Sequence, residues 1–278
     1  MSEQLSFGAR LATAMETRGQ LCVGIDPHPS LLEAWGLNDD VASLERFSRT
    51  AVEAFAGLAA AAKPQVALFE RHGSAGMAVL ERVLADLAAA EVLSIADAKR
   101  GDIGSTMAAY ADAWLRDGSP LAADALTVSP YLGFESLRPA LDMAEKTGRG
   151  VFVLALTSNP EGAAVQHVGG RDSVARRIVQ AAATENERYG ARLGSVGLVV
   201  GATVGEFLEE LEIDLLSVRG PILAPGLGAQ GATAADLRSG FGSAFSAVLA
   251  TSSRDILAAG PTVIGLRQAV ERTRDALA

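Results

Sequence analysis

The sequence is poor in the features that mark secreted, membrane and metal-binding proteins. Its single cysteine, Cys22, excludes an intrachain disulfide and fits a reducing compartment such as the cytoplasm; because it lies in an apolar run, we expect it in the core. The segment Met1–Arg10 lacks the pattern of a secretion signal, and no apolar run is long enough to cross a bilayer. The histidines, His28, His72 and His167, are too scattered to predict a metal site.

Positive charge is also scarce. The chain has 24 Lys and Arg residues against 33 Asp and Glu residues, which gives a net charge of −9. This balance argues against nucleic acid or an anionic membrane as a partner, since both would be repelled. A small anionic substrate remains possible, because a local cationic pocket can oppose the overall sign. The apolar content of 49% is enough for a sizeable core.

Short apolar runs alternate with helical patterns. Strands are expected at 20–25, 63–69, 92–99, 125–129, 150–157, 196–203, 221–224 and 246–251. Helices are expected at 44–62, 76–90, 105–116, 135–146, 172–189, 205–211, 234–238 and 261–277, with Ser105 and Thr106 as cap residues of the third. Continuous apolar strands indicate a sheet buried on both faces, and the alternation predicts an α/β fold, a single (β/α)8 TIM barrel over residues 1–278. The alternative, an open doubly wound sheet, is disfavoured because no G-x-G-x-x-G follows the first strand.

The stretch 96–106, A-D-A-K-R-G-D-I-G-S-T, interrupts a buried strand with charge. Asp97 and Lys99 are two residues apart, so on an extended chain their side chains share one face. Asp102 follows Gly101, where the chain must turn. Two acids and a base are therefore crowded at the end of a strand, where a barrel places its active site.

The ends of other expected strands supply further candidates. Asp26 follows the first strand, Lys63 stands on the second, and Ser158 follows the fifth. The glycine-rich loop 225–231, P-G-L-G-A-Q-G, follows the seventh strand, and Arg254 follows the eighth. Loops after these last two strands form the usual phosphate cradle of the barrel, where backbone N–H groups and a guanidinium can bind an anion.

The charged stretch resembles D-x-K-x-x-D-I-x-x-T, the signature of the orotidine 5′-phosphate decarboxylases, and the match includes Ile103 and Thr106. The candidates between Asp26 and Arg254 fall where that family has functional groups. The chain length and the stretch T-S-N-P-E-G are similar to the longer, type 2 branch. The charged trio alone is less specific, because related sugar-phosphate decarboxylases and synthases share it.

The resemblance implies cofactor-free decarboxylation of orotidine 5′-phosphate to uridine 5′-phosphate, the last step of pyrimidine nucleotide synthesis. Lys99 would stabilise the carbanion at C6 and then protonate it, held by an alternating array. That array is Lys63, Asp97, Lys99 and Asp102. In a homodimer, three residues would complete the neighbouring subunit's site: Asp102, Ile103 and Thr106.

The resemblance also implies the substrate contacts. Asp26 and Lys63 would bind ribose hydroxyls, and Ser158 would read the pyrimidine amide edge. The phosphate would be held by Gly228, Gln230 and Arg254. The loop from Ser158 to Gly170 is long enough to act as a lid.

Two other functions stay open at this point. Lys99 could be a Schiff-base nucleophile of a phosphosugar aldolase, although two flanking carboxylates would keep it protonated. The chain could also be a non-catalytic phosphate-binding barrel, against which the intact charged array argues.

Overall fold

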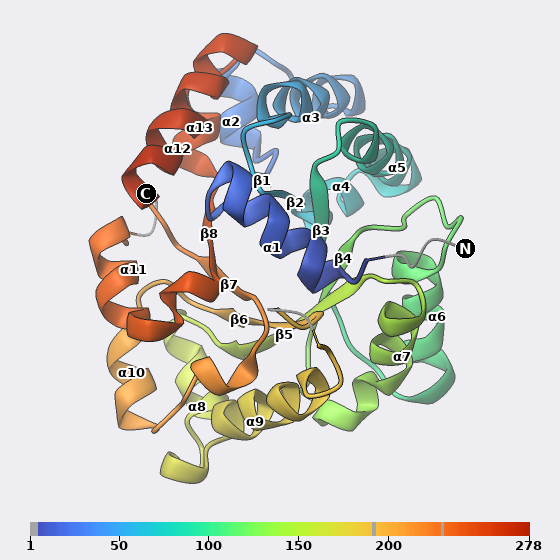
Figure 1. The fold of residues 1–278 in the computed structure, drawn as a ribbon. Coiled ribbons are helices and arrows are strands. Elements are labelled where there is room, and N and C mark those ends of the chain that lie inside the picture. Colours follow the sequence, from blue (N-terminus) through green and yellow to red (C-terminus); the bar gives the residue numbers. More distant parts are fainter. Residues whose placement is uncertain (1–4, 191–192, 229–230) are drawn as a thin grey trace.

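The computed structural model describes residues 5–190, 193–228 and 231–278, and it forms a closed barrel of parallel strands inside a ring of helices (Figure 1). Each strand pairs with the next along the chain, and β1 closes the barrel against β8. The strands are β1 (Leu21–Ile25), β2 (Ala61–Pro64), β3 (Leu93–Arg100), β4 (Ala125–Val128), β5 (Gly150–Leu156), β6 (Val196–Val200), β7 (Ile222–Pro225) and β8 (Val248–Ser252). The predicted (β/α)8 architecture is confirmed.

Helices connect the strands and cover the outside of the barrel (Figure 1). The α-helices are α1 (Phe7–Arg18), α2 (Pro29–Ala34), α3 (Val41–Phe55), α4 (Val66–Glu70), α5 (Gly73–Ala89), α6 (Gly104–Leu115), α7 (Arg138–Lys146), α8 (Ala163–Gln166), α9 (Val174–Asn186), α10 (Gly205–Glu210), α11 (Ala234–Phe241), α12 (Arg254–Leu257) and α13 (Val263–Leu277). Short 3-10 helices are η1 (Phe134–Leu137), η2 (Pro160–Gly162), η3 (Gly170–Asp172), η4 (Leu216–Val218) and η5 (Gly242–Ala247). Among the residues described, no helix is long and apolar enough to span a bilayer.

The N-terminal helix α1, which the sequence reading did not predict, closes one end of the barrel. Its Phe7, Leu11 and Met15 lie one turn apart on one face and pack against the small and apolar side chains inside the barrel. The ring of Phe7 meets that of Phe152 edge-on, with centroids 5.9 Å apart. A Cβ at Gly150 would lie 2.3 Å from the Phe7 ring, so this floor requires glycine there. The functional residues must therefore lie at the other end.

Two expected boundaries around the second strand are wrong. The helix expected at 44–62 ends at Phe55, because Gly57 adopts a left-handed conformation (φ +74°) that stops it. The strand expected at 63–69 occupies Ala61–Pro64, and Val66–Glu70 is helical. A short apolar run does not distinguish a strand from a buried helix by periodicity alone.

Two smaller expectations also need correction. Helix α6 begins at Gly104 behind Ile103, whose side chain makes no cap hydrogen bond, so Ser105 and Thr106 lie in its first turn and are not caps. The segment expected as a long loop, Ser158 to Gly170, contains the short helices η2 and α8.

Candidate active site

A cavity of about 520 Å³ opens at the carboxyl end of the strands. The structure brings six of the predicted site residues together in its wall, and these come from or follow five different strands. They are Asp26, Lys63, Asp97, Lys99, Ser158 and Arg254. These six predicted residues thus share one cavity at the end of the barrel where this fold places its active sites.

The centre of the cavity wall is a carboxylate between two ammonium groups. Lys63 Nζ donates to Asp97 Oδ2 at 2.8 Å, and Lys99 Nζ donates to Asp97 Oδ1 at 2.5 Å. Lys63 and Asp97 are nearly buried, whereas the side chain of Lys99 is 43% exposed. Each oxygen of Asp97 thus holds one cation, and Lys99 is the more exposed of the two lysines, although both line the cavity.

The electrostatics of this cluster favour its fully charged form. Burial alone would raise the pKa of Asp97, but the charges of Lys63 and Lys99 outweigh it and hold that pKa well below its usual range. Burial would lower the pKa of Lys63, but the charges of Asp97 and Asp26 raise it above its usual value. Asp97 is therefore ionised and Lys63 is protonated at neutral pH.

A buried threonine that the sequence reading missed supports the cluster. Thr127, on β4, donates its hydroxyl proton to Asp97 Oδ1 at 3.0 Å. Its Oγ1 also accepts the backbone N–H of Lys99 at 2.9 Å. The available signal was a single polar residue within the apolar strand A-L-T-V.

Several residues of the cavity wall have a side-chain oxygen that lacks a hydrogen-bond partner within the described part of the chain. Asp26 Oδ1, Gln65 Oε1 and Ser253 Oγ are buried and have no hydrogen-bond partner among the described residues. Buried polar atoms are normally satisfied, so orphans that converge on one cavity indicate a polar ligand such as a sugar. His28 also lines the wall, and neither His28 nor Gln65 was among the predicted site residues.

The loops after β7 and β8 meet at one side of the cavity. Pro225, Gly226 and Leu227 line it beside Ser253 and Arg254, and the exposed Arg254 is a cation there without a described hydrogen bond. This pairing of a glycine-containing loop with an arginine suits an anionic group.

Gly228, the next residue of that loop, is placed differently from the expectation. It lies beside the cavity lining, and its N–H donates to the carbonyl of Ala232 at 2.9 Å. Its left-handed φ of +79° and its contact with Asp255 both require glycine. In this structure Gly228 therefore shapes the loop, and its role toward phosphate stays a prediction. Gln230 lies outside the described residues.

The three residues assigned to a neighbouring subunit lie outside the cavity lining. Asp102 Oδ1 accepts the N–H of Ile103 at 2.8 Å, and Ile103 is 62% exposed. Thr106 is exposed in the first turn of α6. These side chains are on the surface of this chain, at the loop that follows the lysine-bearing strand.

The segment after β5 is fastened at its start. Gln166 Oε1 accepts the N–H of Thr157 at 2.8 Å, and Gln166 Nε2 donates to Thr157 Oγ1 at 2.8 Å. Ser158 and Asn159 follow and line the cavity. Gln166 thus holds the start of the predicted lid segment in place beside the cavity.

Comparison with known proteins agrees with this geometry. Residues 19–269 match the family model described as "Orotidine 5'-phosphate decarboxylase / HUMPS family". Orotidine 5′-phosphate decarboxylases of Salinispora arenicola and Streptomyces coelicolor are 60% and 58% identical to this chain over 270 and 268 residues, covering 96% of it and 95% of each relative. The solved structure of Leishmania donovani OMP decarboxylase is 30% identical, has a TM-score of 0.76, and covers 98% of both chains. The chain therefore belongs to the orotidine 5′-phosphate decarboxylase / HUMPS family.

Proposed function

We propose that the protein decarboxylates orotidine 5′-phosphate to uridine 5′-phosphate and CO₂, without a cofactor. The names of its relatives support the activity. The observation that carries the proposal is the Lys63–Asp97–Lys99 cluster, which presents one open ammonium group to the cavity. Orphaned oxygens and Arg254 in the same wall suit the ribose and the phosphate of such a nucleotide.

The reaction needs a fixed cation beside the reacting carbon. The bond between C6 and the carboxylate breaks, CO₂ leaves, and the electron pair remains on C6 of the pyrimidine. That pair lies in the ring plane, so no adjacent group delocalises it. The Lys99 ammonium stabilises the developing charge and then transfers a proton to C6, which gives the product; Lys99 regains its proton from water.

One lysine does not supply the whole rate enhancement. Two unit charges about 4 Å apart interact by roughly 4 kcal/mol at an effective dielectric near 20. Enzymes typically lower barriers by about 8–23 kcal/mol. Asp97 contributes by holding the Lys99 ammonium before the reaction starts, so little reorganisation accompanies charge development. Contacts to the phosphate and ribose supply further energy that can be used to enclose the ring.

The proposed substrate contacts follow the positions in the cavity. Asp26 and Lys63 bind ribose hydroxyls, Ser158 reads the amide edge of the pyrimidine, and Arg254 binds the phosphate. Gln230 would join Arg254, and the segment after Ser158 would close over the ring as a lid. Arg254→Ala is the most direct check of the phosphate assignment.

We also propose a homodimer in which Asp102, Ile103 and Thr106 complete the partner's site. Their position at the surface, next to the strand that carries Lys99, supports this. In mixtures of inactive Lys99→Ala and Asp102→Ala proteins, subunit exchange would restore intact sites, at most about a quarter of the total in a two-fold dimer. A mixture that stays inactive after proven exchange contradicts shared sites.

A cytoplasmic location is the simplest setting for this chemistry. The thiol of Cys22 is unpaired inside the barrel, where burial raises its pKa to about 12 and keeps it unreactive. Cell fractionation would test the location.

The activity is tested by the loss of orotidine 5′-phosphate absorbance when purified protein is added in EDTA. Turnover in EDTA supports a metal-free decarboxylase, whereas a requirement for magnesium favours the sugar-phosphate relatives. Borohydride trapping with substrate tests Lys99 as a Schiff-base nucleophile; a covalent adduct would contradict its role as an ammonium ion. Absence of any turnover would leave the phosphate-binding barrel as the better description.

A further inference from the structure

The Thr127 hydroxyl is both a hydrogen-bond donor and a hydrogen-bond acceptor within the lysine–aspartate cluster. It lies two residues after Ala125, which faces the inside of the barrel, so its side chain points inward on the same side. It is completely buried. Its two partners are Asp97 Oδ1 and the backbone N–H of Lys99.

The direction of these two bonds is fixed by chemistry. The Lys99 N–H can only donate, so it must face a lone pair of the Thr127 oxygen. The Asp97 carboxylate is ionised and can only accept, so the hydroxyl proton must point toward it. The hydroxyl therefore has one satisfactory orientation, and it locates a side chain and a backbone at the same time.

The strand pairing shows why a side chain is needed here. Ala96 pairs with Leu126, and Arg100 pairs with Val128, so β3 has two more residues than β4 between these pairs. The regular ladder is interrupted over Asp97, Ala98 and Lys99. Within this interruption, the Thr127 hydroxyl accepts the hydrogen bond from the Lys99 N–H. Backbone pairing between the two chain segments resumes where the Ser129 N–H donates to the Arg100 carbonyl at 2.8 Å.

Lys99 has an unfavourable backbone conformation within this bulge. Its φ is +48°, in the left-handed region that is unfavourable for a residue with a side chain. Such conformations persist where the surrounding contacts hold them in place. The bond to Thr127 is one contact that does so, and without it Lys99 could relax and move its ammonium group.

We propose that Thr127 is a positioning residue for decarboxylation: it fixes the Lys99 backbone and the Asp97 carboxylate, and thereby the ammonium group beside C6. The expected effect on kcat rests on the proposed function. The restraint that Thr127 places on the Lys99 backbone does not depend on that function. Thr127 is too deeply buried beneath the two charged side chains to be assigned a contact with substrate.

The same pair of strands offers a matched control at its other end. Ser94 Oγ on β3 donates to Asp124 Oδ2 at 3.1 Å and accepts the Asp124 N–H at 3.0 Å. Ser94→Ala therefore removes the same two kinds of bond as Thr127→Val, from a buried hydroxyl that joins β3 to the residue preceding β4. Asp124 is held by Arg10 of α1, on the side away from the cavity.

The first experiment compares kinetics of Thr127→Val, Thr127→Ser and Ser94→Ala, each corrected for the folded fraction. Displacing a catalytic group by about 1 Å can cost about 100-fold, so Thr127→Val should lower kcat by about 10- to 100-fold with KM changed much less. Thr127→Ser keeps the hydroxyl and should recover kcat to within about threefold of wild type. Ser94→Ala should lower Tm but leave kcat within about twofold.

The second experiment observes the Lys99 backbone directly. The chain contains three lysines, Lys63, Lys99 and Lys146, so labelling with ¹⁵N-lysine gives three backbone amide signals. Thr127→Val should speed hydrogen exchange of the Lys99 amide at least about tenfold relative to the other two, whereas Ser94→Ala should not. A general loss of stability would accelerate all three.

These measurements separate the possible failures. Wild-type protein without decarboxylase activity would overturn the proposed function, while faster exchange at Lys99 would still support the structural part. Active wild type with an unchanged kcat in Thr127→Val would overturn the positioning role alone. Equal kcat losses in Thr127→Val and Ser94→Ala, or no rescue by serine, would also overturn it.

Discussion

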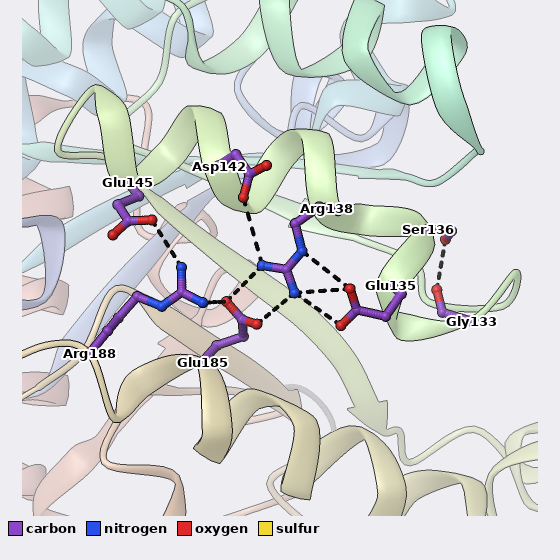
Figure 2. Close-up of polar contacts among 8 residues, drawn as sticks. All are labelled: Gly133, Glu135, Ser136, Arg138, Asp142, Glu145, Glu185 and Arg188. Atoms are coloured by element: carbon purple, nitrogen blue, oxygen red, sulfur yellow. Dashed lines mark hydrogen bonds and ion pairs between the residues drawn. The ribbon is translucent and has the colours of Figure 1, made fainter.

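Two alternating charge clusters in this molecule resemble each other closely, but they lie in different parts of the fold. At the barrel mouth, Asp97 lies between Lys63 and Lys99. On the outer ring, Glu185 near the end of α9 lies between Arg138 of α7 and Arg188 (Figure 2). Both central carboxylates are similarly buried, at 9% and 8% side-chain exposure.

The difference lies in what the outer cations contact. Arg138 also bonds to Glu135, and Arg188 donates to Glu145 at 3.0 Å, so further carboxylates surround the outer cluster (Figure 2). Lys99 has no second carboxylate among its described contacts, and its ammonium is open to the cavity. A cluster closed by its own counter-ions stabilises helix packing, whereas one that ends in an open cation can bind an anion from outside.

Lys99→Ala should have the largest effect on activity. The proposed mechanism makes Lys99 both the electrostatic stabiliser and the proton donor, so turnover should fall by at least about 10³-fold. Steady-state absorbance assays measure this, with circular dichroism to check the fold. Lys146→Ala, which removes an exposed lysine on α7, is the matched control and should keep wild-type rates. Near-normal turnover in Lys99→Ala would contradict the assignment.

Removal of the Arg254 guanidinium should lower activity less than removal of the Lys99 ammonium. A hydrogen bond to a charged group contributes about 1.5–3 kcal/mol, so Arg254→Ala should reduce kcat/KM by roughly 10- to 100-fold, mainly through KM. Orotidine, which lacks the phosphate, serves as the control substrate and should be turned over equally by wild type and variant. An equal loss on both substrates would show that Arg254 does not bind phosphate.

The outer cluster should affect stability and leave chemistry unchanged. Glu185→Ala leaves Arg138 and Arg188 facing each other, and because both are partly exposed we expect a loss of about 1–2 kcal/mol in the free energy of unfolding. Urea denaturation measures the loss, while kcat per folded molecule should stay unchanged. Asp112→Ala, which removes a long, exposed ion pair with Arg116, is the control and should change stability little. A fall in the kcat of Glu185→Ala would contradict this prediction and show that the outer cluster influences the active site.

The pH dependence of stability should show the smallest effect. The hydrogen bond from Arg138 lowers the pKa of Glu185 below its usual value, so the folded state holds this carboxyl ionised where the unfolded chain would protonate it. Its contribution is present above about pH 4.3 and is lost as pH falls through the lower, folded-state pKa. Urea midpoints of wild type and Glu185→Gln should converge on acidification; a constant difference would contradict this.

The sequence predicted the barrel because its strands are apolar throughout, but it was misleading around β2. The run Ala59–Ala62 has strong helix propensity, yet these small side chains fit the barrel wall, and tertiary packing overrode the propensity. Gly57 was the signal in the sequence that the preceding helix ends before it. Helix α1 was also readable, since Ser6 caps it and Phe7, Leu11 and Met15 repeat every fourth residue.

For the site, the charged motif was readable because Asp97 and Lys99 interrupt a buried strand. Thr127 gave only a weak signal, one polar residue in an apolar strand, because its role depends on the irregular pairing between β3 and β4. Gln65 was missed because the expected strand continued through it to residue 69. In the structure β2 ends at Pro64, so Gln65 lies at the carboxyl end of the strand and lines the cavity. The sequence of one chain likewise does not show which surface meets a second copy.

The floor formed by α1 determines which end of the barrel small molecules use to reach the site. Phe7 and Leu11 fill the far end of the barrel with a ring and methyl groups, so the described residues leave no polar route through that end. In the proposed reaction, nucleotide and carbon dioxide therefore enter and leave at the mouth of the cavity, as does the water that returns a proton to Lys99. All three share the opening between the loops that line the cavity.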